Sequence, residues 1–280
     1  MISKIRPKGK NEMKLTHEDR VALAKRNERP DQEEIDLSLS VRKSNQLIQR
    51  NRFNLTLREQ RLLLYCISKI RPTDKGTETY TISIREVIKA CGIETVTGGA
   101  YRAIREALKK LDSFNFELTD ENHRTHLVHW IRSVVIDPEN KNQAKVNFEF
   151  DPKIVPYLFE VKKNFTQYQL RNALQMKSEY GMRLYELLKS YTHAYRKTGE
   201  HEFEIGELRK ALCADTKSYE QYGAFKKYIL DKAIDDIMTY SDLKVTYLEV
   251  KSGRKVIAVR FIMSELDPME YSDRQGWTFD

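Results

Sequence analysis

The chain has 280 residues, of which 40% are hydrophobic, so it is long and apolar enough to bury the cores of about two domains. The 49 Lys and Arg residues outnumber the 41 Asp and Glu residues, and the resulting net charge of +8 favours a polyanionic partner. Three widely spaced cysteines argue against a disulfide framework or a zinc ribbon. No apolar run approaches the roughly 20 residues of a membrane span or forms the core of a secretory signal. We therefore expect a cytoplasmic protein that does not bind membranes.

Residues 1–40 form a polar segment that opens with five cations, namely Lys4, Arg6, Lys8, Lys10 and Lys14. Apart from a short helix expected over residues 16–27, this segment has too few apolar residues to fold by itself. We predict a partly disordered basic arm. Two roles stay open for it: contact with phosphates, or solubility alone.

The first ordered elements carry clear local signals. A capping box at Thr56–Glu59 opens a helix that ends before Pro72, and residues 80–84 alternate as a short strand. A second capping box, Ser83–Glu86, opens a helix that stops at Gly92. These signals predict helix, strand and helix in that order.

A third helix follows a loop that contains Gly98 and Gly99, with Ile104 and Leu108 on its inner face. Two strands, at residues 127–136 and 144–150, are joined by a turn at residues 137–140. Helix, strand, helix, helix and hairpin is the order of a winged helix. We therefore predict that residues 41–150 form one winged-helix domain.

The same order of elements restarts over residues 151–263. A constant offset of 121 residues pairs nine positions of the two halves, among them Leu63 with Leu184 and Ile82 with Phe203; after Tyr222 the offset becomes 126. The sequence thus predicts an α+β protein of two tandem winged-helix domains related by internal duplication. Residues 264–280 follow as an acidic C-terminal tail, which we expect to be frayed chain.

The long helix of the second half, at residues 222–239, is the candidate for reading a DNA groove. Its apolar stripe repeats every four residues, and the residues at or near its start can recognise base edges: Gln suits adenine, Lys suits guanine and Glu suits cytosine. The candidates are Glu220, Gln221, Lys226, Lys227 and Tyr228. Lys226 falls near the apolar stripe, so we rank it below Lys227. Asp231 and Asp235 would repel phosphate, which predicts that only the N-terminal half of the helix enters the groove.

Two further groups of cations are candidate DNA contacts. A glycine turn between the last two strands carries Lys251, Arg254 and Lys255, which suit phosphate or minor-groove contacts. The first domain offers the analogous residues Arg102, Arg105 and Lys109. A solvated charged face explains the latter three nearly as well.

Catalytic chemistry finds little support in the sequence. The histidine cluster His123, His126 and His129 lies in a segment with the pattern of a strand, where His126 would point away from the other two. No phosphate-binding loop for ATP is present, and fifteen tyrosines make any single one uninformative. We predict no catalytic residue, no metal site and no cofactor.

Several segments carry a family resemblance. They are Ser44–Ile48 with Leu55–Leu62, then Tyr180–Leu188, and finally Phe225–Lys227 through Lys251–Arg254. Together these segments resemble the replication initiators of iteron plasmids. The resemblance spans roughly residues 41–263. It implies two winged-helix domains that bind short direct repeats in double-stranded DNA at the plasmid origin as a monomer. It also implies a homodimer, joined through the first domain, that represses the initiator's own gene, and a host replication initiator and helicase as partners.

The sequence departs from the family where Glu220 and Gln221 replace frequent arginines and where Tyr228 interrupts a basic run, so the base sequence that is read stays open. Two other functions also stay open. One is a winged-helix transcription regulator without a role in replication. The other is an origin-nicking endonuclease with a tyrosine nucleophile.

Overall fold

The computed structural model describes residues 39–93, 97–113, 115–119, 124–136, 145–159, 161, 163–192, 198–267 and 269–271. Nearly all of the predicted basic arm, the predicted turn at residues 137–140 and His123 lie outside these residues. The described elements form two winged helices, and each is preceded by a strand and a short helix.

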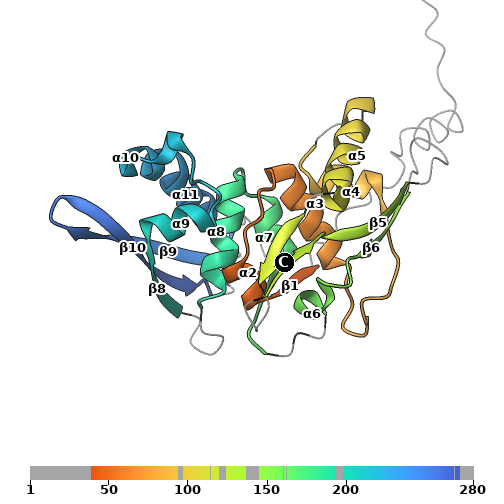
Figure 1. Ribbon diagram of the computed structural model, residues 1–280, viewed down its shortest axis with the longest axis horizontal. Coiled ribbons are helices and arrows are strands. Elements are labelled where there is room, and N and C mark those ends of the chain that lie inside the picture. The colour runs from red at the N-terminus through yellow and green to blue at the C-terminus, as the bar shows by residue number, and fades with distance from the viewer. Residues whose placement is uncertain are drawn as a thin grey trace, which may run out of the picture. The chain divides into compact units, whose positions relative to one another are not determined.

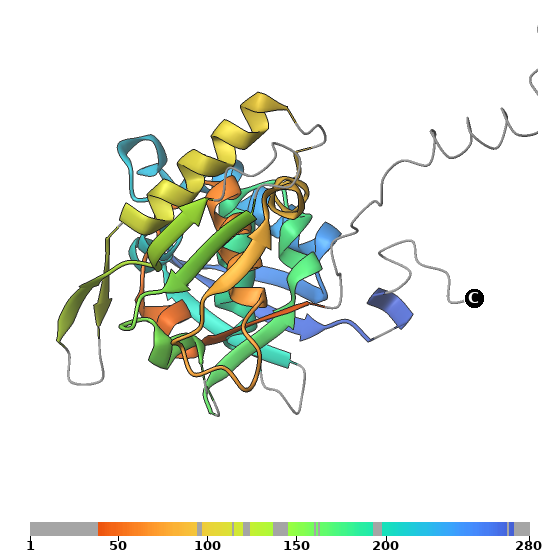
Figure 2. The same ribbon diagram turned by 90° about the vertical axis from the view of Figure 1, so that its right-hand side faces the viewer.

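The first winged helix consists of α3 (Leu57–Ser68), β2 (Tyr80–Ser83), α4 (Ile84–Ala90), α5 (Gly98–Ser113), β5 (Ile131–Ile136) and β6 (Lys145–Phe150). Its strands form an antiparallel sheet in the order β2–β6–β5, and α5, yellow in Figure 2, lies across it. The capping box forms as predicted, because the Thr56 N–H donates to the Glu59 carboxylate (2.9 Å). The helix positions predicted as inner, Ile104 and Leu108, are fully buried.

Two predictions for this domain are wrong. The helix α5 begins at Gly98, within the predicted loop, because the Thr97 hydroxyl accepts the N–H of Ala100 (3.2 Å) and stabilises the first turn. The predicted strand at residues 127–136 is two strands: β4 (Thr125–Val128) pairs with β3 (Phe116–Thr119) in a hairpin that we did not predict, and β5 is separate.

The break between β4 and β5 is fixed by Trp130. This side chain is fully buried, and its ring centroid lies 4.7 Å from that of Phe53 and 4.8 Å from that of Phe116. Burying so large an aromatic group outweighs the continuity of one strand. The inserted hairpin is therefore held on the first winged helix by an aromatic cluster.

The second winged helix repeats the first. It consists of α8 (Glu179–Lys189), β8 (Thr198–Glu204), α9 (Ile205–Ala211), α10 (Tyr222–Phe225), the π-helical turn η2 (Lys226–Leu230), α11 (Asp231–Tyr240), β9 (Leu243–Ser252) and β10 (Lys255–Glu265). A 3-10 turn, η1 (Lys217–Tyr219), precedes α10. The sheet order β8–β10–β9 matches β2–β6–β5, which confirms the predicted internal duplication.

The duplication extends further towards the N-terminus than the sequence indicated. Strand β1 (Ser40–Ser44) and helix α2 (Asn45–Arg50) precede the first winged helix, and β7 (Phe165–Gln169) and α7 (Leu170–Leu174) precede the second. The two strands pair with each other, antiparallel and centred on Arg42 and Gln167. A short helix, α6 (Val155–Leu158), lies between β6 and β7 along the chain.

The acidic tail is packed at Leu266 and Tyr271, so the prediction of frayed chain is wrong for these two residues. Leu266 is buried and its N–H donates to the Asp242 carbonyl (2.8 Å), while the Tyr271 hydroxyl bonds to the Asn172 side chain. Tyr271 also lies under the Arg171 guanidinium at 4.9 Å. Among the described residues, no helix combines the length and the apolar character needed to cross a membrane.

Candidate nucleic-acid interface

The long helix of the second winged helix runs through α10, η2 and α11, and we call these residues, 222–240, the recognition helix. The predicted stripe of Phe225, Ile229, Ala233 and Ile237 is fully or almost fully buried. Within the helix, the Asp231 N–H donates to the Lys226 carbonyl five residues earlier, which defines a π turn.

The π turn explains how this helix differs from α5. The sequence offset between the two halves grows from 121 to 126, so five residues are inserted. At about 100° per residue, five α-helical residues would rotate the apolar stripe by about 140° away from the core. The π turn takes up one of the five inserted residues, because it holds one residue more than an α-helical turn. The other four inserted residues make about one full α-helical turn. The stripe therefore stays on the core and the exposed face keeps its direction.

The exposed face at the start of this helix carries four of the predicted residues. Glu220 and Gln221 lie immediately before α10, and both are exposed; the Glu220 carbonyl accepts from the Arg209 guanidinium (2.7 Å). Lys227 and Tyr228 are exposed about two turns further on, with the Lys227 Nζ 5.1 Å from the centre of the Tyr228 ring. These side chains are available to an approaching DNA groove.

Lys226 has a different environment. Its Nζ donates to the Tyr247 hydroxyl (2.7 Å) and to the Glu249 carboxylate (3.1 Å), both on β9. The hydrogen bond to Tyr247, helped by that to Glu249, raises the pKa of Lys226 above its ordinary value. The hydrogen bond from Lys226 is also the main cause that lowers the pKa of Glu249. Lys226 thus ties the recognition helix to the last hairpin.

That hairpin, β9–β10, is the wing, and in Figure 1 it extends beyond α9 and α11 to its turn. The predicted five-residue turn is shorter than expected: Ser252 pairs with Lys255, so only Gly253 and Arg254 remain in it, and Gly253 has a φ of +60°. Arg254 and Lys255 are exposed. Lys251 is exposed too, but it forms an ion pair with Glu249 (3.3 Å).

The candidates of the first domain lie on the outer face of α5. Arg102, Arg105 and Lys109 are all exposed. Lys109 pairs with Glu106 (2.9 Å), whereas no ion pair joins Arg102 or Arg105 to another described residue. The geometry is that of a solvated helix face with two available guanidinium groups.

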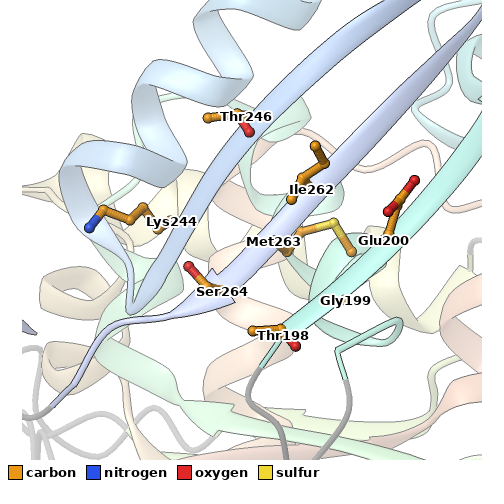
Figure 3. A pocket seen from close by; sticks show the side chains of 8 residues that line it. All are labelled: Thr198, Gly199, Glu200, Lys244, Thr246, Ile262, Met263 and Ser264. Carbon is orange, nitrogen blue, oxygen red and sulfur yellow. The ribbon is translucent and has the colours of Figure 1, made fainter.

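A depression of about 460 Å³ lies on the outer face of the β8–β10–β9 sheet. Figure 3 shows the side chains that line it, which come from all three strands: Thr198, Gly199, Glu200, Lys244, Thr246, Ile262, Met263 and Ser264. None of the predicted DNA contacts is among them. Its charged side chains are one carboxylate, Glu200, and one ammonium, Lys244, so the depression offers no excess of positive charge to phosphate.

No catalytic arrangement emerges from the residues that the structure describes. No group of three or more His, Cys, Asp or Glu side chains among them could hold a metal ion. Cys66 and Cys91 are buried, and burial raises the pKa of the Cys91 thiol to about 12, so it is a poor nucleophile.

Sequence reasoning missed Tyr222, Tyr247 and Glu249 as members of this site. Tyr222 opens α10, and its hydroxyl donates to Glu249 (3.0 Å); the Tyr247 hydroxyl donates to Asp231 (2.7 Å). The strand pattern places residues 247 and 249 on one side of β9, which was the available signal. Their partners on the helix follow only from the tertiary structure.

The fold and this site define the class of the molecule: a tandem winged-helix protein with an exposed polar recognition helix and a basic wing. Residues 40–189 match the family model described as initiator replication protein, WH1, and residues 204–263 match that described as initiator Rep protein, WH2. The chain therefore belongs to the initiator replication proteins, and the family resemblance inferred from its sequence is confirmed.

Two curated relatives come from Escherichia coli. A replication initiation protein is 26% identical over 211 residues, which are 74% of this chain and 64% of the relative, so the match spans just under two thirds of that protein. The PI protein is 23% identical over 262 residues, with 81% of this chain and 85% of the relative covered. A crystal structure of Pi initiator protein in complex with iteron DNA has a TM-score of 0.66 at 21% identity, covering 83% of this chain and 100% of that chain.

Proposed function

We propose that this protein starts plasmid replication by binding short direct repeats in double-stranded DNA at the origin. The observation that carries the proposal is the exposed start of the recognition helix, with Gln221, Lys227 and Tyr228, in the same domain as a wing that ends in Arg254 and Lys255. Family membership and the Pi relative, whose structure contains iteron DNA, support it.

The residues divide into two roles. Lys227, Gln221 and Glu220 read base edges in the major groove, with Tyr228 beside them. Phosphate or minor-groove contacts come from the wing and from α5, chiefly through Arg254, Lys255, Arg102, Arg105 and Lys109. Lys251 contributes less, because it is paired with Glu249. Lys226, bound to Glu249, contributes least to direct contact.

The two domains have different roles in this function. Residues 41–150 form the domain for dimerisation and additional DNA contact, and residues 151–263 form the main sequence-specific domain. The protein acts in the cytoplasm without catalysis or cofactor. A homodimer in equilibrium with the monomer represses the initiator's gene, and a host replication initiator and helicase are further partners.

The test begins with the DNA beside the gene, where we expect an array of short direct repeats. The full-length protein should bind one repeat much more tightly than a scrambled duplex of the same composition, at fixed salt. Deleting the gene should abolish copying of the origin. Equal affinity for both duplexes would overturn the proposal; tight binding with copying intact would favour a transcription regulator. A covalent 5′-phosphotyrosine on origin DNA would reveal a nicking enzyme instead.

A further inference from the structure

The carboxylate of Glu249 on β9 joins the recognition helix to the wing. It accepts hydrogen bonds from the Tyr222 hydroxyl (3.0 Å) and the Lys226 Nζ (3.1 Å), and it pairs with Lys251 (3.3 Å). Tyr247, two residues before it on β9, accepts from Lys226 (2.7 Å) and donates to Asp231 (2.7 Å). These side chains together hold the first turns of the helix against one strand of the wing.

The position of this carboxylate is unfavourable for binding DNA in general. A negative charge beside a phosphate-binding surface repels the backbone, and Glu249 also offsets the charge of two lysines, Lys226 and Lys251, that would otherwise attract phosphate. One exposed ion pair stabilises a fold by only about 0–1 kcal/mol, so stability alone gives little reason to place it there. Glu249 differs from a simple surface ion pair. Its side chain is only 24% exposed, and it has three partners, Tyr222, Lys226 and Lys251, instead of one.

What the network can supply is geometry. Tyr222 is the first residue of α10, Lys226 is the first of the π turn, and Lys251 lies close to the turn of the wing. Because Glu249 is itself on the wing, its bonds to Tyr222 and Lys226 fix the angle between the helix that enters a groove and the hairpin that follows the adjacent backbone, while its pair with Lys251 lies within β9. Base readout depends on that angle, whereas attraction to phosphate does not.

We propose that Glu249 is a positioning residue for sequence specificity: it sets the recognition helix against the wing and holds Lys226 and Lys251 back from the phosphates. This inference rests on the proposed function. It predicts that the carboxylate raises the preference for the cognate repeat over other DNA while it lowers affinity for DNA in general.

Two substitutions separate charge from geometry. Glu249→Gln keeps an oxygen that can accept from Tyr222, but it removes the negative charge that offsets Lys226 and Lys251, so binding to scrambled DNA should strengthen by about tenfold. The log–log salt dependence should steepen by about 0.9 for each lysine that reaches a phosphate. Glu249→Ala also removes the acceptor, so affinity for the cognate repeat should fall. In both variants the ratio of cognate to scrambled affinity drops.

A matched control lies on the other face of the same sheet. Glu202 on β8 is also an ion-paired carboxylate, 2.8 Å from Arg260, and Glu202→Gln changes the net charge by the same amount. If the effect at residue 249 were only a change in overall charge, Glu202→Gln would reproduce it. We expect this control to keep the wild-type ratio and salt dependence.

The experiment measures fluorescence anisotropy of full-length wild type, both Glu249 variants and Glu202→Gln on a duplex with one origin repeat and on its scrambled counterpart, over a salt series. Thermal unfolding checks that each protein is folded. If Glu249→Ala does not fold, the result with Glu249→Gln decides whether the inference holds. If the ratio of cognate to scrambled affinity is unchanged in Glu249→Gln, or falls equally in Glu202→Gln, the inference about Glu249 is wrong while the proposed function stands. A wild type that does not discriminate overturns the proposed function and the inference together.

Discussion

Lys227 is the residue of the recognition helix whose charge is best placed for a base edge. It is exposed, and its position beside the Tyr228 ring, at 5.1 Å, still allows the ammonium to donate outwards. Replacing Lys227 by Ala should weaken binding to the cognate repeat by about 1–3 kcal/mol, and binding to random DNA by much less.

Lys232 provides the comparison for Lys227. Its Nζ lies 5.7 Å from the centre of the same Tyr228 ring, but it stands five positions further along the helix. We expect Lys232→Ala to act on cognate and random DNA alike, because it would contact only phosphate. Equal weakening of both DNAs by Lys227→Ala in a titration at fixed salt would assign Lys227 to phosphate as well.

His201 gives the second winged helix a stability that depends on pH. Its ring stacks on Tyr191 with centroids 3.6 Å apart and lies 4.3 Å from Phe203, and burial lowers its pKa below the usual 6.5, with Glu207 opposing weakly. Below about pH 6.5 the unfolded chain then binds more protons than the folded one, so the free energy of unfolding falls as the pH drops further.

Replacement of His201 by Phe should remove this part of the pH dependence, since the ring stays but the proton site is lost. Urea unfolding of both proteins at several pH values from neutral downwards measures it. Identical pH dependence in wild type and variant would show that His201 titrates alike in the folded and unfolded chain.

Helices and strands that depend on local chemistry could be predicted from the sequence, and those that depend on distant partners could not. The capping box at Thr56 acts within four residues, so the start of α3 was predicted correctly. The β3–β4 hairpin depends on Trp130 meeting Phe53 across the chain, which no local pattern reveals. Likewise, Lys227 could be placed on the exposed face from its helical position, whereas the partner of Lys226 on β9 could not be foreseen.

The wing yields a prediction about salt. Neutralising Lys251, Arg254 and Lys255 should flatten the salt dependence of DNA binding by up to about 0.9 log–log units for each phosphate that the wing no longer neutralises. Most of the change should come from Arg254 and Lys255, because Glu249 already occupies Lys251. Binding isotherms over a salt series test this. An unchanged slope would mean that the tip of the hairpin does not touch DNA.

At the scale of the whole molecule, two buried arginines join the repeats in the same way. Arg61 on α3 donates to the Cys91 carbonyl after α4 (2.8 Å) and to Met176 after α7 (2.6 Å). Arg183 on α8 donates to Ala211 at the end of α9 (3.1 Å) and to Asn51 after α2 (2.7 Å). Each guanidinium thus binds helix C-termini, where carbonyls and the helix dipole favour a cation, in both repeats at once.

A buried ion pair adds to this joint. Lys43 on β1 lies 2.6 Å from Glu186 on α8, and both side chains are almost completely buried. Burying two charges stabilises a structure little, but separating them is costly, because each would be left uncompensated. We therefore expect a rearrangement of the two winged helices to break Lys43 from Glu186 and free the two arginines together, which would favour two discrete arrangements over a continuum.

Such a pair of arrangements is what a switch between monomeric initiator and dimeric repressor requires. Two tandem winged helices can occupy one direct repeat as a monomer, each domain taking part of the site. A two-fold dimer instead matches inverted half-sites, because the symmetry of an operator mirrors that of the protein. We expect the adjustment at the junction Phe150–Pro152 and at residues 137–142; the latter segment lies outside the described residues.

Analytical ultracentrifugation tests the switch on the free protein, on a single direct repeat and on an inverted repeat. We expect one monomer on the direct repeat and two on the inverted one. Replacing Glu186 by Gln, which leaves Lys43 without its counter-charge, should weaken the joint and shift the free protein towards the dimer. The same stoichiometry on both DNAs would exclude the switch. Different stoichiometries, but no shift of the variant towards the dimer, would show that the Lys43–Glu186 pair does not control the switch.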